Sequence, residues 1–200
     1  MIFHNRKTFF IFLSLIVCFV LFFSNSQTSP IQTHEFNNAD TAWMIVASAL
    51  VLLMTPGLAF FYGGMVSKKN VISTMLQSFI ALGIISLVWV LFGFSLAFGE
   101  TINGWGIIGN PFQYAFLNNL DSKNSNIPYL LFALFQLKFA IITPAIITGS
   151  FAERIRFRSY LLFMILFCIV IYCPLAHMTW AEDGLFANMG DILNLNGFEN

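Results

Sequence analysis

Charged side chains are scarce in this sequence, and their scarcity excludes an ordinary water-soluble domain. Asp, Glu, Lys and Arg together make up 9% of the 200 residues, whereas hydrophobic residues make up 58%. Soluble globular proteins carry roughly a quarter charged residues, so most of this chain has no water to face. The composition therefore predicts a chain that lies in a lipid bilayer.

The sequence also lacks an excess of either charge sign and lacks the motifs of common catalytic sites. Nine basic and nine acidic residues give a formal net charge of zero, and without a basic stripe we expect no nucleic-acid partner. We find no glycine-rich phosphate loop, no arguable Ser/His/Asp order and no metal-ligand spacing. We therefore expect no enzymatic activity, cofactor or metal site.

Cysteine is rare as well. The chain has three cysteines, Cys18, Cys168 and Cys173, at spacings that match no zinc or redox motif. We interpret them as small residues of the apolar core rather than as ligands or disulfide partners.

The N-terminus has the three parts of a secretory signal. Arg6 and Lys7 precede an apolar run over residues 9–23, and a small polar exit follows at 24–26. We predict a cleaved signal peptide over 1–26. The alternative is a retained extra helix, although the apolar run is shorter than the ~20 residues that span a bilayer.

Four long apolar segments follow, and they predict an all-α, polytopic transmembrane helical bundle. The expected helices cover about 42–66, 71–99, 128–151 and 159–178. Residues 27–40 form a polar extracytoplasmic segment, at the end of which an Asn or Asp side chain caps a helix that begins near Thr41. We expect the transmembrane domain to cover 41–185 and a second extracytoplasmic segment to cover 186–200.

Charges in the connections between these segments predict the orientation of the chain. Short loops rich in Lys and Arg stay cytoplasmic, and the basic residues fall in two alternate connections, 67–70 and 153–158. Glu100 and Asp121 lie in the connection between them. Because a signal peptide also places residue 27 outside, both arguments predict an extracytoplasmic mature N-terminus.

The first apolar segment contains a proline and several glycines. Pro56 and Gly57 favour a bend, because proline removes a backbone donor and clashes with the preceding turn. Gly63 and Gly64 let a neighbouring helix approach closely. We favour a structural role for these residues over direct contact with a substrate.

The third segment combines two aromatic residues with polar ones. Phe135 and Phe139 are four residues apart, so their rings share one helical face; the pattern fits core packing or an aromatic plug in a pore. Lys138 lies well inside the segment, where a charge costs about 2.5 kcal/mol or more, so it needs a partner or a cavity. Gln136, beside it, is a structural or cavity-lining candidate.

The fourth segment ends in His177 and Trp180. A Trp at this position is typical of an interfacial anchor, although its ring also attracts cations. A lone His is weak support for a metal site, and we interpret His177 as a polar group at the end of the helix.

Several of these segments together resemble the ammonium transporter family (Amt, Mep and Rh proteins). The resemblance covers roughly residues 39–185, in the family's order and spacing. The matching stretches are Asp40-Thr41-Ala42-Trp43, LVLLMTPGLAFFYGGMVSKKNVISTM, SLAFG, FQLKFAIITPAIITGSFAERIRF and YCPLAHMTW.

The resemblance implies a homotrimer in which each subunit forms its own pore from two inverted five-helix repeats. This chain holds the first four helices of the first repeat, so we expect it to be part of a longer protein. The family recruits ammonium at an outer aromatic vestibule, whose matching residues here are Trp180 and Phe139, and Phe135 matches the gate. Some members also bind a cytoplasmic signal-transduction regulator.

The sequence departs from the family pattern at two places. The buried aspartate of the family is followed by an aromatic residue and glycines, but Asp191 is not, and the two pore histidines are not in these 200 residues. Lys138 stands where we expect a neutral residue.

From the resemblance we predict channel-like passage of ammonium or ammonia across the cell membrane (plasma or inner membrane), with an ammonium sensor or a non-conducting membrane subunit as alternatives.

Overall fold

The computed structural model describes residues 36–120, 125–152 and 154–189. The predicted signal peptide, Cys18, Asp121 and Asp191 lie outside the described residues. Four helical spans in the described part are long and apolar enough to cross a membrane, as the sequence predicted; they cover Asn38–Met65, Lys68–Phe98, Tyr129–Ser150 and Phe157–Trp180. The helices that form them are α2 (Asn38–Met65), α3 (Val71–Val88), α4 (Phe94–Phe98), α5 (Tyr129–Phe151), α6 (Phe157–Phe167) and α7 (Cys173–Trp180).

The first helix begins earlier than predicted. The Asn37 side chain accepts hydrogen bonds from the backbone amides of Ala39, at 2.9 Å, and Asp40, at 3.2 Å. Because this cap satisfies amides that have no partner inside the helix, α2 starts at Asn38 rather than near Thr41. Residues 38–40, which we predicted as the end of the polar segment, are therefore the first three residues of α2.

The second and fourth spans each contain a five-residue π-helical segment that the sequence did not indicate. These segments are Trp89–Gly93, between α3 and α4, and Cys168–Tyr172, between α6 and α7. They meet, because the Cys173 thiol donates to the Gly93 carbonyl oxygen at 3.5 Å and the rings of Trp89 and Tyr172 lie 6.1 Å apart. The wider turn lets the two spans continue without a break.

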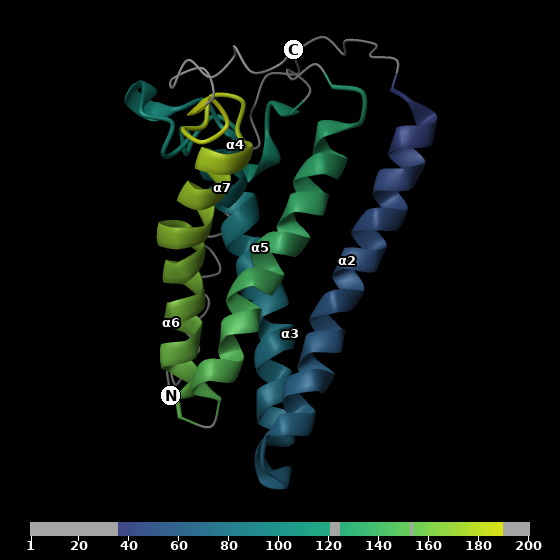
Figure 1. Ribbon diagram of the computed structural model, residues 1–200, viewed down its shortest axis with the longest axis vertical. Coiled ribbons are helices and arrows are strands. Elements are labelled where there is room, and N and C mark those ends of the chain that lie inside the picture. Colours follow the sequence, from purple (N-terminus) through teal and green to yellow (C-terminus); the bar gives the residue numbers. More distant parts are fainter. Residues whose placement is uncertain (1–35, 121–124, 153, 190–200) are drawn as a thin grey trace, which may run out of the picture. The chain divides into compact units, whose positions relative to one another are not determined.

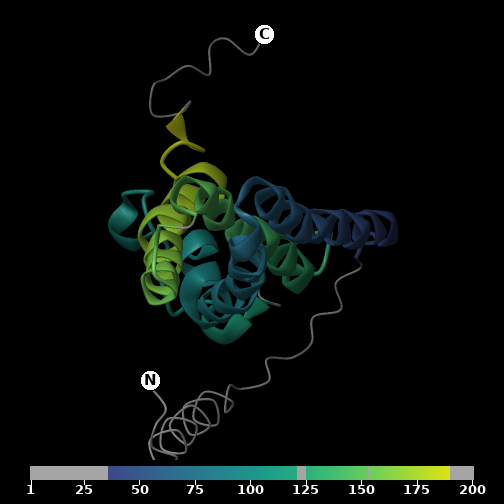
Figure 2. The same cartoon turned by 90° about the horizontal axis from the view of Figure 1, so that it is seen from below.

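Helix α2 packs against α3 and α5 through small side chains. Its fully buried residues are Thr55, Ala59 and Gly63, which recur every four residues and form one stripe. The Tyr62 hydroxyl next to this stripe donates to the Ile146 carbonyl of α5. Most other side chains of α2 are exposed, and Figures 1 and 2 show this helix at the edge of the bundle.

The core lies where α3, α5 and the α6–α7 span meet. Trp89 is its largest fully buried side chain, and its indole N–H donates to the Ala133 carbonyl of α5 at 3.1 Å. Cys168 and Cys173 are also buried here and are not disulfide-bonded, which agrees with their interpretation as core residues. In Figure 1, α5 lies between α2 and α6, with α3 behind them.

The basic connections lie at one end of the bundle. Lys68 and Lys69 fall between α2 and α3, and Arg156 precedes α6 directly; Figure 1 shows both connections at the lower end. The acidic residues Glu100 and Glu182 follow the helix ends on the opposite side. The basic and acidic residues that alternate between connections in the sequence therefore lie at opposite ends of the folded bundle.

Candidate functional site

Helix α5 has one packed side and one aromatic side. One stripe of residues that recur every three or four positions is almost completely buried and forms the packed side; they are Ala133, Leu137, Ala140, Pro144 and Thr148. In the second half of the helix Ile141, Ile142 and Ala145 are buried as well, so the packing there extends round toward the other side. Phe135 and Phe139 lie on the other side of the helix and are half-buried. Their ring centroids are 5.1 Å apart, and the ring planes cross at 73°.

This arrangement confirms that the two phenylalanines are neighbours, and the edge-to-face geometry is a favourable one for aromatic rings. Phe139 also packs against the core. Ile146, further along the same side of α5, is 52% exposed. The aromatic side of α5 is thus only partly covered by the described residues.

Two polar side chains flank the aromatic pair. The side-chain oxygen of Gln136 is buried and has no hydrogen-bond partner within the described residues. Lys138 is half-buried. A buried acceptor without a partner costs about 1–3 kcal/mol, so this part of α5 is suited to a polar neighbour or to water.

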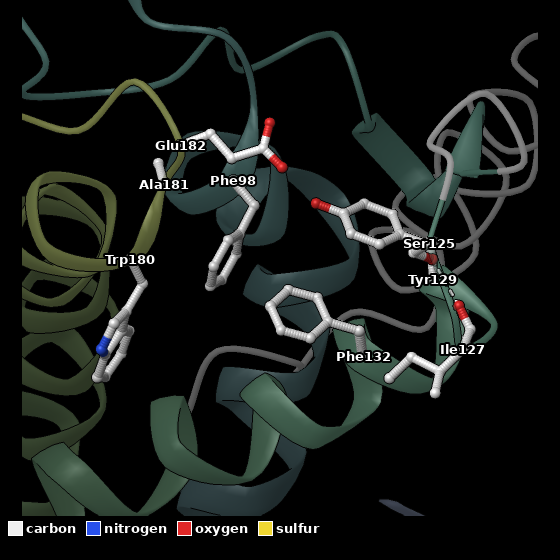
Figure 3. Close-up of a pocket in the computed structure, with 8 residues that line it drawn as sticks. All are labelled: Phe98, Ser125, Ile127, Tyr129, Phe132, Trp180, Ala181 and Glu182. Atoms are coloured by element: carbon white, nitrogen blue, oxygen red, sulfur yellow. Dashed lines mark hydrogen bonds between the residues drawn. The ribbon is translucent and has the colours of Figure 1, made fainter. Parts of the chain in front are cut away.

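Trp180 lies in a separate cavity at the acidic end of the bundle. It is the last residue of α7 and is 52% exposed. The cavity has a volume of about 230 Å³ and is lined by Phe98, Ser125, Ile127, Tyr129, Phe132, Trp180, Ala181 and Glu182. Figure 3 shows the rings of Phe98 and Phe132 close together, with Tyr129 directed toward the Glu182 carboxylate.

The aromatic rings of this cavity are packed to one another. The Phe98 and Phe132 centroids are 5.0 Å apart with nearly perpendicular planes, and Tyr129 stacks on Phe132 at 5.4 Å. Four aromatic side chains and one carboxylate therefore surround the same space, which is a suitable environment for a cation. Phe135 and Phe139 do not line this cavity; they follow Phe132 along α5.

Next to it lies a second cavity, which has an acidic rim. Its volume is about 560 Å³, and its lining includes Glu100, Glu182 and Asp183. Phe98 and Glu182 line both cavities. Negative charge is thus concentrated beside the aromatic cavity, and such a field raises the local concentration of cations.

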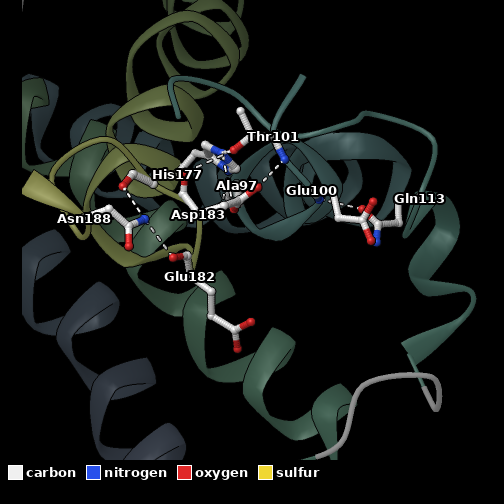
Figure 4. Close-up of polar contacts among 9 residues, drawn as sticks. Ala97, Glu100, Thr101, Gln113, His177, Glu182, Asp183 and Asn188 are labelled. Carbon is white, nitrogen blue, oxygen red and sulfur yellow. Dashed lines mark hydrogen bonds and ion pairs between the residues drawn. The ribbon is translucent and has the colours of Figure 1, made fainter. Parts of the chain in front are cut away.

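A buried histidine connects the two loops that form these cavities. His177 is completely buried, and its Nδ1 lies 3.2 Å from the Ala97 carbonyl oxygen. Its Nε2 lies 2.8 Å from the Thr101 hydroxyl and 3.9 Å from an Asp183 carboxylate oxygen. Figure 4 shows that these contacts join α7, the end of α4 and the loop after each.

Asp183 is tied to the same loop through its own carboxylate. The Thr101 amide donates to it at 2.5 Å. Partial burial opposes ionisation of this carboxyl, but the hydrogen bonds from Thr101 and the nearby His177 outweigh burial, and together they lower the pKa of Asp183 from its ordinary value of 3.8. Sequence reasoning missed this group, because the residues that meet are about 80 positions apart.

The glycines of α2 differ from one another in their surroundings. A Cβ at Gly63 would lie 2.9 Å from the Met75 side chain of α3, whereas a Cβ at Gly57 or Gly64 would meet nothing within 4 Å. Helix α2 continues through Pro56 without a break in its assignment. Close packing against the described helices is therefore found at Gly63.

Comparison with known proteins places these features in a family. The sequence model of the Ammonium Transporter Family matches residues 42–196. An ammonium transporter of Mycobacterium bovis is 44% identical over 172 residues, which cover 77% of this chain and 36% of that protein.

Solved structures give the same result. The crystal structure of Saccharomyces cerevisiae Mep2 matches with a TM-score of 0.71 and 33% identity, over 83% of this chain and 37% of that one. A structure described as a sensor Amt protein matches with a TM-score of 0.67 and 31% identity, over 72% of this chain and 34% of that one. The chain thus spans just over a third of the length of these relatives. Because the family model covers more than half of the chain, this protein belongs to the ammonium transporter family.

Proposed function

We propose that this protein transports ammonium or ammonia across the cell membrane. The observation that carries the proposal is the similarity to ammonium transporters at 44% identity over most of the chain, on a bundle that has four membrane-length helices. The protein acts as a channel-like transporter and not as an enzyme.

The chemistry of this transport is a problem of desolvation. A bare cation in an apolar pore loses far more hydration energy than one or two aromatic rings return. The aromatic groups therefore attract the cation while it is still partly hydrated, at ~0.5–2 kcal/mol for each contact. The proton and the ammonia then separate, as the family resemblance implies, a step that the family carries out at two pore histidines.

Two groups along the path share the recruitment. The cavity at Trp180 has the exposed indole and lies beside the acidic rim of the second cavity, so it meets the cation first. Phe135 and Phe139 lie further along α5 and face away from its packed side, so they form the gate. Lys138 and Gln136 flank this gate, Gly63 sets the close contact of α2 with α3, and Pro56, Gly57 and Gly64 are structural candidates of α2.

The test replaces the aromatic residues in the protein expressed from its gene in a transporter-deficient strain. We expect Trp180→Ala and Phe139→Ala to change the half-saturating concentration or maximal rate of labelled methylammonium uptake by about 2- to 30-fold, which corresponds to one lost cation–π contact. Leu175→Ala is the matched control, because Leu175 is an exposed apolar residue of the same α7 helix as Trp180.

Both aromatic variants must reach the membrane in the amount of the unsubstituted protein. Unchanged uptake kinetics in both would show that Trp180 is an interfacial anchor and Phe139 a packing residue. Uptake by the unsubstituted protein no greater than in the empty strain would refute transport itself.

The proposal includes an arrangement in the membrane. We propose that the end with the basic connections faces the cytoplasm, because short loops rich in Lys and Arg stay on that side. The Trp180 cavity and the mature N-terminus, after removal of the signal peptide 1–26, then lie outside. We further propose a homotrimer and, at the cytoplasmic end, a signal-transduction regulator as a partner.

An ammonium sensor on the same fold is the second candidate function. The observation that favours it is the structural match to the protein described as a sensor Amt. A signalling domain encoded after the transmembrane part, together with a response to ammonium without uptake, would identify a sensor. A membrane subunit that neither conducts nor signals is the remaining alternative, and bound ammonium would argue against it.

A further inference from the structure

Lys138 is a charged residue in an unusual place. It is the tenth residue of the span Tyr129–Ser150, so it lies near the middle of a membrane-length helix. Within the described residues it has no hydrogen bond and no ion pair, although it is half-buried. Ionisable side chains at such a depth are costly, and they face a protein interior or a water-filled cavity rather than lipid.

The helical geometry shows which side of α5 Lys138 occupies. At 3.6 residues per turn, it is rotated by about 60° from Phe135 and about 100° from Phe139. The stripe of buried residues formed by Ala133, Leu137, Ala140, Pro144 and Thr148 lies on the side opposite Phe135. Lys138 is thus closer in rotation to Phe135 than to this stripe, and it lies one to two turns before the buried Ile141 and Ala145.

The aromatic side is also flanked by the Gln136 oxygen, which is one of the buried polar atoms without a partner among the described residues. Two polar side chains therefore flank Phe135 and Phe139, one on each side. A helix face that faced only lipid would leave both groups unsatisfied. A face that lines a hydrated path satisfies both.

From this placement we propose that Lys138 is a specificity-determining residue, a fixed positive charge on the conducting side of α5 that weakens the binding of a cation at Phe135 and Phe139. The inference rests on the proposed transport function and adds a feature of this chain to it. The Lys138 ammonium and a cation at the Phe139 ring repel one another, so the charge favours passage of the neutral species.

The size of the effect follows from the separation. Lys138 and Phe135 are three positions apart, so their Cβ atoms are neighbours at ~5–6 Å, and the lysine side chain is long enough for its ammonium to lie about 8 Å from a cation on the rings. Two unit charges at that distance, at an effective dielectric constant of about 20, weaken occupancy of the site by roughly 30-fold. The repulsion is larger than the attraction that one ring supplies.

The experiment compares charge-removing and charge-keeping substitutions in the protein expressed from its gene. We expect Lys138→Met and Lys138→Gln each to lower the half-saturating concentration of methylammonium uptake by about 10- to 30-fold, with little change in the maximal rate. Lys138→Arg keeps the charge, so its half-saturating concentration stays within about twofold of the original. The amount of each variant in the membrane fraction is measured in parallel.

Three results would overturn the inference. If uptake is measurable but Lys138→Met and Lys138→Gln bind methylammonium no more tightly, the charge does not act on the cation, and the transport function stands. If the amount in the membrane fraction is reduced for both neutral variants but not for Lys138→Arg, Lys138 is one half of a structural ion pair. If the unsubstituted protein and all variants reach the membrane without any uptake, the proposed function fails and the inference fails with it.

Discussion

The hydroxyl group of Thr101 is the most informative place to perturb the outer end of the bundle. It lies 2.8 Å from His177 Nε2 and 3.2 Å from the Asp183 carbonyl oxygen. A carbonyl only accepts hydrogen bonds, so His177 Nδ1, 3.2 Å from the Ala97 carbonyl, carries a proton. The Asp183 carbonyl likewise only accepts, so the Thr101 hydroxyl donates to it, and the same hydroxyl links the His177 ring to the loop after α7.

Replacement by valine removes this donor at nearly constant volume. His177 is completely buried, so water cannot replace the lost hydrogen bond, and the Asp183 carboxylate at 3.9 Å is too distant to do so. A buried polar group without a partner costs about 1–3 kcal/mol. We therefore expect Thr101→Val, which removes the hydrogen-bond partner of His177 Nε2, to lower the free energy of unfolding by about that amount.

The measurement is reversible unfolding of the purified protein by SDS titration in mixed micelles. Thr101→Ser is the matched control, because it keeps the hydroxyl and loses only a methyl group, and its loss should stay near 1 kcal/mol or below. The double variant Thr101→Val, His177→Leu should lose less unfolding free energy than the sum of the losses in the two single variants, because both substitutions remove the same interaction. Equal stabilities of Thr101→Val and Thr101→Ser would refute the assigned role of the hydroxyl.

Two further predictions concern packing and pH. Gly63→Leu should destabilise the protein by about 1–3 kcal/mol, because the new Cβ would lie 2.9 Å from the Met75 side chain, and Gly64→Leu, which meets open space in the described part, should cost less in the same SDS titration. Because the pKa of Asp183 is lowered in the folded protein, its ionised carboxylate stabilises the fold at pH values above its ordinary pKa of 3.8, and this stabilisation is lost as the pH falls through the folded-state pKa. Thermal unfolding midpoints below pH 5 should therefore fall in the original protein and change less in Asp183→Asn. A flat pH profile in both proteins, or equal costs for the two glycine variants, would contradict these explanations.

The four spans were predictable from sequence because their signal is local. Long runs without charge mark a membrane helix whatever lies beside them, and the structure places the third span within one residue of the predicted bounds at 128–151. The fourth span runs from Phe157 to Trp180, two residues longer at each end than predicted. Helix ends depend on caps and loop contacts, so they are predicted less well than helix centres.

The two π-helical segments had no usable signal. A π turn inserts one extra residue into a helix whose composition is otherwise unchanged, and Trp89 reads as an ordinary apolar residue in the sequence. Its burial and its bond to Ala133 come from α5, which is 44 positions away. The same reason explains the missed group at His177, whose partners belong to another span.

Among the candidate site residues, sequence and structure contribute in different ways. The spacing of Phe135 and Phe139 was enough to predict that their rings meet, and the centroid distance of 5.1 Å confirms it. For Trp180 the residue type indicated an exposed helix end, but nothing local indicated that Phe98 and Phe132 would share its cavity. Contacts between spans require the packing of α4, α5 and α7.

The position of His177 on α7 gives the buried network a consequence for the site. His177 precedes Trp180 by three residues, so the two side chains project from nearly the same side of the helix, about one turn apart. The bonds of His177 to Ala97 and Thr101 restrict the rotation of α7 about its axis. Since Trp180 is the last residue of that helix, the same bonds hold the side of α7 from which its indole projects, and contacts with α4 and Thr101 thereby support an aromatic group of the cavity.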